Sequence, residues 1–280
     1  MKKHLLLIIF LLAAGSLAAQ KETDQKPQKW YIRIALGGGV STSSSFDLLY
    51  DYDNSGGSKS VSVHPVGIGN GFCAAVGFGY WFSKYVGVEV AVNHFLGLPV
   101  EGDSVVHLMG ATQANVNVAG SLLSVIPSVV ISAGLDKINP YARFGLLVGV
   151  WPRITTQYTQ ENSTVNPPTS LTINNQYYGG LSLGYQAAGG VTFSMSKLIS
   201  LFAELQFSHS TWSPSYSEIT KYDVNGEDKL STLLPYQKQV NFVDKKYITG
   251  TVDMSQPKEE LRKTIPFSTA AIMFGIKFKL

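Results

Sequence analysis

Only 15% of the 280 residues are charged, against about 25% in a typical soluble domain, and 22 basic and 19 acidic side chains give a formal net charge of +3. This near neutrality argues against a nucleic-acid partner. A disordered or collagen-like chain is excluded by the 27 glycines, 11% aromatic residues and mean hydropathy of +0.09. A bundle of membrane helices needs several apolar runs of about 18 residues, and these are missing. A membrane β-barrel or a large secreted β-structure therefore fits best.

Residues 1–19 have the features of a secretory signal peptide. Two lysines at positions 2 and 3 precede an apolar stretch of ten residues, which is short for a membrane span, and small residues lead up to Ala19. We expect cleavage after Ala19, a short periplasmic leader over residues 20–29, and a barrel domain over residues 30–280. Because Cys73 is the single cysteine, an internal disulfide and a cysteine-rich metal site are excluded, and we expect no cofactor.

Eight segments with apolar residues at every second position follow the leader. In the last segment the outward candidates Ile272, Phe274 and Ile276 alternate with smaller or polar residues, which is the period of a β-strand and not of a helix. The predicted strands cover residues 30–37, 72–82, 86–92, 122–132, 142–150, 181–193, 199–207 and 272–280.

One segment has an alternative interpretation. Residues 119–135 are nearly apolar, and their serines would also align along a short helix. Pro127 and the β-branched run that follows it favour a strand, and so does the even strand number that a barrel of this kind requires. Pro127 removes one donor from the strand ladder, and the sequence does not explain how that is accommodated.

The connections between these strands fall into two length classes. Short turns near residues 83–84, 134–138 and 195–197 alternate with long polar connections. The four long connections are predicted as loops over residues 40–69, 97–118, 152–176 and 209–265. Bacterial outer-membrane barrels have an even strand number, short periplasmic turns and long extracellular loops. The sequence therefore predicts an all-β, eight-stranded, antiparallel, up-and-down transmembrane barrel, with residues 240–247 of the last loop as a candidate for additional β-structure.

Charged residues of the predicted strands all fall on the face opposite the apolar series. Because lipid cannot solvate charge, this face must be the inside of the barrel. The predicted heights are similar, so we expect a structural network of paired charges low in a filled interior, and not a conducting pore. The members of this inward charge network are Arg33, Glu89, Arg143, Glu204 and Lys277.

Aromatic residues gather near the ends of the strands that the short turns connect. Amphipathic rings prefer the headgroup region of a membrane, so these residues are predicted to form a periplasmic girdle. The predicted girdle consists of Trp30, Tyr80, Phe82, Tyr85, Tyr141, Phe193 and Phe278.

Three stretches resemble one family of membrane proteins. The stretch GFGYWFSKYVGVEVAVNHF at residues 77–95, NPYARFGLLVGV at 139–150 and the terminal PFSTAAIMFGIKFKL at 266–280 are similar to small OmpA-like or OmpX-like outer-membrane barrels, especially the Bacteroidetes-type barrel domain of the "porin family". The resemblance implies an outer-membrane location in a Gram-negative bacterium, contact with outer-membrane lipid, and folding by the barrel assembly machinery. The chain departs from the closing-strand signal at Leu280, where an aromatic residue is usual.

The motifs of this resemblance specify architecture and not activity. We expect a non-enzymatic barrel with a structural role, or one that presents its extracellular loops to a surface partner that the sequence does not identify. A narrow porin-like channel for small solutes is the main alternative. A lipid A-modifying enzyme is a weaker one, because His209 is followed by Ser210 and Thr211 and lacks a serine two residues away. A secreted lipocalin-like barrel would place its apolar face inward.

Overall fold

The structure is a computed structural model. It describes residues 29–43, 50–53, 60–63, 67–104, 113–162, 169–246 and 252–280. The predicted signal peptide and residues 20–28 of the predicted leader lie outside the described residues, and so does Tyr247. In the described part of the chain, no helix has both the length and the apolar character needed to cross a membrane.

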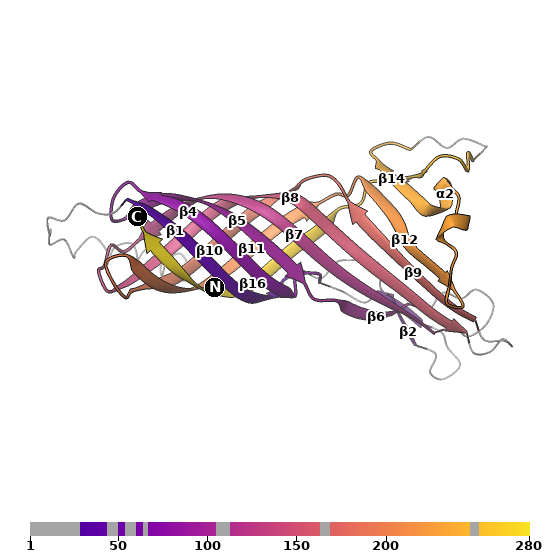
Figure 1. The fold of residues 1–280 in the computed structure, drawn as a ribbon, viewed down its shortest axis with the longest axis horizontal. Coiled ribbons are helices and arrows are strands. Elements are labelled where there is room, and N and C mark those ends of the chain that lie inside the picture. Colours follow the sequence, from indigo (N-terminus) through magenta and orange to yellow (C-terminus); the bar gives the residue numbers. More distant parts are fainter. Residues whose placement is uncertain are drawn as a thin grey trace.

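Eight long antiparallel strands form a closed barrel (Figure 1). They are β1 (Trp30–Ser41), β4 (Gly71–Trp81), β5 (Val86–Gly97), β7 (Gln113–Ser132), β8 (Ile138–Asn162), β10 (Ser182–Ser194), β11 (Ile199–Trp212) and β16 (Ile265–Lys279). The hydrogen-bonded order is β8-β10-β11-β16-β1-β4-β5-β7, and pairing of β7 with β8 closes the ring. All eight predicted strands and the all-β barrel class are confirmed.

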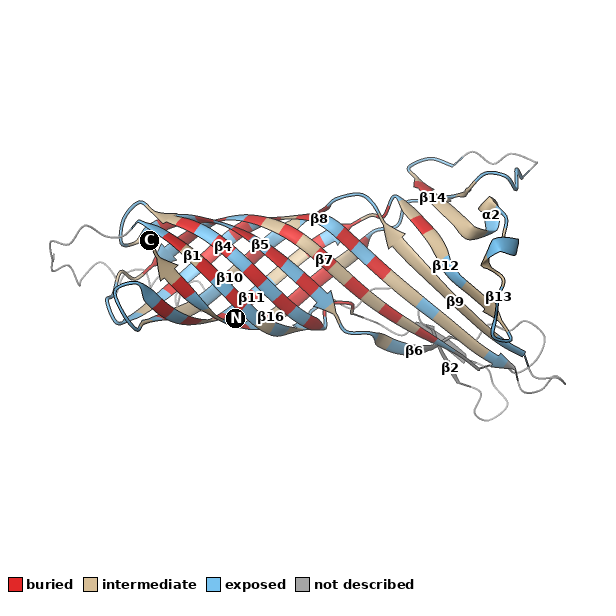
Figure 2. Ribbon diagram, viewed as in Figure 1, coloured by how far each residue is buried: buried red, intermediate tan, exposed pale blue. Residues whose placement is uncertain are grey.

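The alternation of burial along the strands explains why the chain forms a barrel. In β1, Tyr31, Arg33 and Ala35 are buried while Ile34 and Leu36 are exposed, and the same check pattern runs round the wall (Figure 2). Side chains of a strand point alternately to the two faces, so one face of every strand lines the inside and the other covers the outside. The exposed face is the apolar one.

Pro127 lies within β7, so the helical alternative for this segment is wrong. Its residues pair with β5 without interruption, and Pro127 lies opposite Val90. On the other side, the ladder between β7 and β8 has no paired residues at Ile126 and Pro127. The missing backbone donor therefore falls where the ladder is already interrupted, which is how the strand accommodates a proline.

Beyond one end of the barrel, the wall continues as an open sheet (Figure 1). The upper parts of β7 and β8 pair from Gln113 to Leu123, and the sheet continues in the order β15-β14-β12-β9-β8-β7-β6. Its further strands are β6 (Val100–Ser104), β9 (Thr169–Tyr178), β12 (Tyr216–Val224), β13 (Glu227–Asp228), β14 (Gln239–Val243) and β15 (Lys258–Leu261). A 3-10 helix η2 (Leu230–Thr232), a short helix α2 (Pro235–Lys238) and a hairpin of β2 (Tyr50–Asp53) and β3 (Ser60–Val63) complete the described elements.

This sheet corrects the prediction that residues 97–118, 152–176 and 209–265 are loops, and the hairpin of β2 and β3 corrects it for part of residues 40–69. Strand β8 runs on to Asn162, and β9 returns from Thr169. Threonine, asparagine and glutamine alternate here without an apolar face, and that face was the signal used to recognise strands. Strand β14 shows that residues 239–243 do add β-structure, whereas residues 244–246 are not in a strand.

Candidate functional site

The interior of the barrel near the short turns holds a ring of four ion pairs. Arg33 of β1 and Arg143 of β8 each contact both Glu89 of β5 and Glu204 of β11, with nitrogen to oxygen distances of 2.8 to 3.1 Å. All four side chains are at least 95% buried. The structure therefore brings together four of the five charged residues that the strand pattern placed on the inner face. Because each charge has two partners of opposite sign, the ring balances its own charge inside the barrel.

Two tyrosines also donate hydrogen bonds to the glutamates of this ring. The Tyr31 hydroxyl donates to Glu89 Oε2 at 3.0 Å, and the Tyr141 hydroxyl donates to Glu204 Oε2 at 2.6 Å. Glu204 thus uses one oxygen for both arginines and the other for Tyr141, whereas Glu89 Oε2 accepts from Arg33 Nε at 3.2 Å as well as from Tyr31. The sequence could have predicted both tyrosines on the inner face. Each precedes an inward arginine by two residues, and residues two apart in a strand point to the same face.

The fifth charged residue, Lys277, lies among aromatic rings. Its ammonium nitrogen is 4.7 Å from the ring centre of Tyr31, 5.0 Å from that of Tyr141 and 5.8 Å from that of Trp81. Cation–π attraction to these rings favours the buried ammonium. The ion pairs found among the described residues do not include Lys277, so the structure separates it from the ring of four. The sequence-based network did not foresee this aromatic cage.

Six of the seven residues predicted for the periplasmic girdle lie at the surface of the barrel near the short turns. Trp30, Phe82 and Phe193 are exposed, while Tyr80, Tyr85 and Phe278 are partly exposed. Trp30 stacks on Phe78 and contacts Tyr80, which links two strands at this level. The assignment of Tyr141 to the girdle is wrong, because its side chain is 92% buried and bonds to Glu204 inside the barrel.

Above the ion pairs the interior is filled by other side chains. A cavity of about 10 Å³ lies among Cys73, Asn93 and Ser124, and this is no more than the space of about one water molecule. Towards the open sheet, Phe95, Leu122 and Phe267 belong to one buried apolar cluster, which also contains Trp212. At these levels the described side chains therefore fill most of the lumen.

The outer surface of the barrel has the opposite character. Leaving aside Lys279 at the end of the last strand, the eight strands predicted from the sequence contain five charged residues. All five side chains point into the barrel. Large apolar side chains are exposed on the outer face of all eight strands. Examples, which are between 53% and 67% exposed, are Leu36, Phe72, Val90, Ile131, Phe144, Leu183, Leu205 and Phe274.

One polar pair lies on this outer face. His209 of β11 is directly opposite Ser268 of β16, and its Nδ1 is 2.6 Å from the Ser268 hydroxyl oxygen. Ser210, the residue after His209, points inward instead and bonds to Ser182 at 2.9 Å. Among the described residues, no cluster of three or more potential metal ligands is found.

Comparisons with known proteins give a likeness only at the level of structure. No protein-family model matches the chain, and no curated protein matches it. Neisserial surface protein A (NspA) is 10% identical with a TM-score of 0.37, and the match covers 90% of this chain and 97% of that one. CarO2 of Acinetobacter baumannii is 11% identical with a TM-score of 0.34, covering 89% and 99%. Ail, the attachment invasion locus protein of Yersinia pestis, is 10% identical with a TM-score of 0.29, covering 89% and 98%. At these TM-scores the likeness gives no basis for assigning a function.

Proposed function

We propose that this chain is an integral outer-membrane β-barrel of a Gram-negative bacterium. It closes its lumen with its own side chains, is not an enzyme, and supports the envelope or contacts a surface partner through its extracellular sheet. The observation that carries the proposal is the distribution of charge and apolar area: the barrel buries its charges and exposes its large apolar side chains.

Water and lipid would select opposite arrangements of these two faces. In a soluble barrel the apolar face would cover the interior and the charged face would meet solvent, as in a lipocalin. Lipid cannot solvate charge or unpaired backbone groups, and a closed barrel with an apolar outside satisfies both demands. The exposed faces of β1, β4 and β5 alone carry more contiguous apolar surface than a soluble monomer tolerates.

The outer membrane is the proposed location because of the N-terminal segment and the family resemblance. A cleaved signal peptide over residues 1–19 would deliver the chain to the periplasm. There the barrel assembly machinery would insert it, with the short turns on the periplasmic side and β9, β12 and β14 outside the cell. Outer-membrane lipid is then the immediate partner of the barrel wall.

The extracellular sheet is the part that can meet a partner in solution. Strands β9 and β12 carry polar and aromatic side chains in partly exposed positions, including Tyr178 and Tyr216, whose rings pack at 5.0 Å. Polar surfaces with aromatic residues are common in recognition sites. A barrel with an occluded lumen leaves this sheet as its largest accessible polar surface.

Membrane insertion is tested by fractionation and by heat-modifiable migration. The protein should be recovered from the outer membrane only with detergent, and it should migrate faster on a gel when unheated than after boiling, because the closed barrel resists unfolding. Recovery in the soluble periplasmic fraction without heat-modifiable migration would overturn the proposal.

The orientation is tested with two surface cysteines and one internal control. On intact cells, Lys229→Cys beside the extracellular sheet should react with a membrane-impermeant maleimide, whereas Lys197→Cys in a short turn should not. The native Cys73 is buried and should stay unreacted in both variants. Labelling of Lys197→Cys and not of Lys229→Cys would show the reverse orientation.

A further inference from the structure

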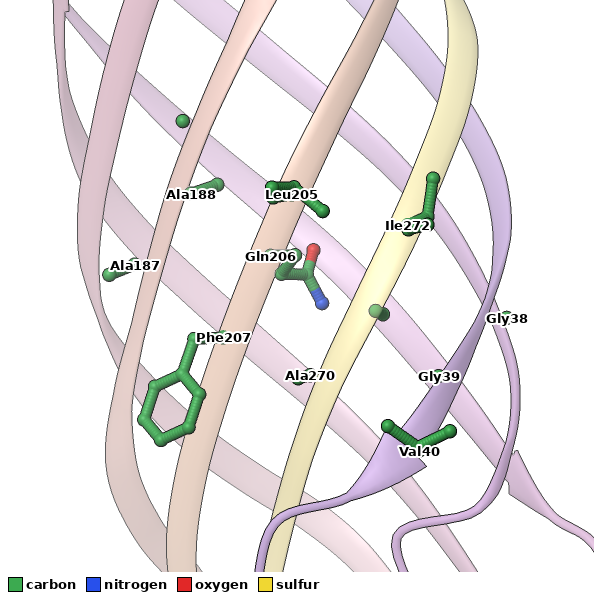
Figure 3. A pocket seen from close by; sticks show the side chains of 12 residues that line it. Gly38, Gly39, Val40, Ala187, Ala188, Leu205, Gln206, Phe207, Ala270 and Ile272 are labelled. Atoms are coloured by element: carbon green, nitrogen blue, oxygen red, sulfur yellow. The ribbon is translucent and has the colours of Figure 1, made fainter.

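The outer wall of the barrel has a hollow that spans four neighbouring strands. A groove of about 650 Å³ lies across the four adjacent strands β10, β11, β16 and β1 (Figure 3). Side chains that point outward form most of its lining, and no strand from the opposite side of the barrel contributes, so the groove opens to the outside. The outward residues are Gly38, Val40, Ala187, Gly189, Leu205, Phe207, Ala270 and Ile272.

The shape of the groove follows from small residues at neighbouring positions. Gly189 lies beside Leu205, and Gly38 lies beside Ile272, so each large side chain has a residue without a side chain next to it. Ala187 and Ala270 flank Phe207 in the same way. A hollow of this size is within the range of ligand pockets, and its outward lining is apolar.

The polar pair on the outer face lies one outward position beyond the residues that line this groove. Phe207 and Ala270 are partners in the ladder, and the next outward position on each strand towards the open sheet is His209 and Ser268. Ser268 is 98% buried, whereas His209 is partly exposed. The serine therefore holds the imidazole ring, and the histidine is the group that a ligand in the groove can reach.

The height of His209 matches the boundary of the apolar band. Ten residues separate it from Ile199 at the start of β11. A tilted strand climbs roughly 2.5 Å per residue along the barrel axis, so His209 lies about 25 Å above Ile199. This is the height of the apolar band of such barrels, and above it the carbonyl linkages and headgroups of the outer leaflet begin.

We propose that the groove binds one acyl chain of an outer-leaflet lipid and that His209 hydrogen-bonds the carbonyl that joins this chain to the headgroup. An acylated lipid is an apolar chain with one polar linkage at its end, and the site has the same order along the barrel axis. When Ser268 donates its hydroxyl hydrogen to Nδ1, the ring proton lies on Nε2 and can be donated to a carbonyl. Ser268 is a positioning residue, since its burial denies a substrate access to the hydroxyl. The inference rests on the membrane location proposed above.

Filling the groove tests the binding of the chain. Purified protein in detergent is titrated with dipalmitoyl phosphatidylethanolamine, and retained lipid is counted by native mass spectrometry. Ala270→Leu should lower retention at least fivefold relative to the wild type, because the added side chain occupies the groove. Ala74→Leu is the matched control, since Ala74 is exposed on the outer face of β4 and does not line the groove. Equal retention by wild type and Ala270→Leu, or an equal loss in Ala74→Leu, would overturn the proposal.

An ether analogue of the same lipid tests the role of His209. The dihexadecyl ether has no carbonyl, so wild type should retain the ester lipid about fivefold better, which is the effect of one net hydrogen bond. His209→Phe keeps an aromatic ring and should abolish this preference, and Ser268→Ala should reduce it.

Equal retention of the two lipids by wild type would remove His209 from the site, and release of palmitate from the ester lipid would show Ser268 to be a nucleophile instead. A dimer that displaces the lipid would show the groove to be a subunit contact.

These measurements separate the groove from the proposed function. Fractionation and heat-modifiable migration report on the membrane location and do not depend on lipid retention in detergent. A membrane-inserted barrel that retains no lipid would overturn only the proposal that the groove binds an acyl chain.

Discussion

At the scale of single residues, the shared carboxylate oxygens make the buried ring vulnerable to the loss of one member. Glu89 Oε1 lies 2.9 Å from Arg33 Nη2 and 3.1 Å from Arg143 Nη1, so one oxygen holds two guanidinium groups. Burying four charges costs desolvation free energy that their mutual attraction offsets only while all partners are present. A single substitution therefore leaves a buried charge without its full set of partners.

We predict that Glu89→Leu destabilises the barrel by about 3 kcal/mol, and Arg143→Leu by a similar amount, because each leaves uncompensated buried charge. The free energy of unfolding should be measured by urea titration of the protein in lipid vesicles. Glu227→Leu removes the partner of Lys229 from an exposed ion pair and should change stability by less than about 0.5 kcal/mol. Wild-type stability in both buried variants would mean that the ring does not support the fold.

Small residues on the inner face determine whether the large ones fit. A methyl group added at Gly79 would overlap the Tyr31 ring, which is held by Glu89 and by the ammonium of Lys277. We predict that Gly79→Ala destabilises the barrel by about 1–3 kcal/mol, as overpacking does in other cores. The outward Gly189 has no atom within 4 Å of an added methyl group, so Gly189→Ala should be close to neutral in the same urea titration. Equal effects of the two substitutions would contradict a tightly packed interior.

At the scale of elements, the strands in the barrel wall were predictable and the further strands of the open sheet were not. The period of two with one apolar face identified all eight barrel strands, and strand parity placed Arg33, Glu89, Arg143 and Glu204 on one inner surface. The upper half of β8 also has a period of two, but both of its faces are polar, so hydrophobicity carried no signal there. The position of Tyr141 near a strand end favours the girdle. Its spacing of two residues from Arg143 places it on the inner face instead, and the structure follows that spacing.

Glu218 of β12 joins three further elements of the open sheet and its surroundings. From β12 its carboxylate accepts hydrogen bonds from Tyr178 of β9 and Gln239 of β14, at 3.3 Å each, and it pairs with Lys238 of α2 at 3.2 Å. Burial opposes ionisation of this carboxyl group, but the hydrogen bonds from Gln239 and Lys238 outweigh it, so the pKa of Glu218 lies below its ordinary value of 4.5. A lowered pKa means that ionised Glu218 stabilises the native sheet above pH 4.5.

We predict that the sheet loses this stabilisation as the pH falls below 4.5 and through the folded pKa of Glu218. Hydrogen-exchange protection of residues 239–243, corrected for intrinsic exchange rates, should fall between pH 6 and pH 3. Glu218→Gln should show lower protection at pH 6 and a smaller fall towards pH 3, because the titrating group is gone. A fall of equal size in wild type and variant would assign the pH dependence to other carboxyl groups.

At the scale of the whole molecule, the interior is closed in successive layers. The aromatic cage around Lys277 lies nearest the short turns, the four ion pairs follow, and the apolar cluster with Phe267 and Trp212 fills the end next to the open sheet. An eight-stranded barrel has room for little more than its own inward side chains. The balance of charge and volume inside therefore favours a closed barrel over the porin-like alternative.

We predict that the protein forms no steady channels in planar lipid bilayers. Ions would have to displace paired charges at one level and cross packed apolar side chains at another, where the cavity among Cys73, Asn93 and Ser124 measures about 10 Å³. Conductance should be recorded after reconstitution of protein whose heat-modifiable migration shows that it is folded, with a 16-stranded porin as the positive control. Brief, irregular current steps that disappear on further purification would leave the closed barrel intact. Steady, reproducible conductance by the folded protein would establish the channel in its place, and Arg143→Leu should then change its ion selectivity, because the ring would line the pore.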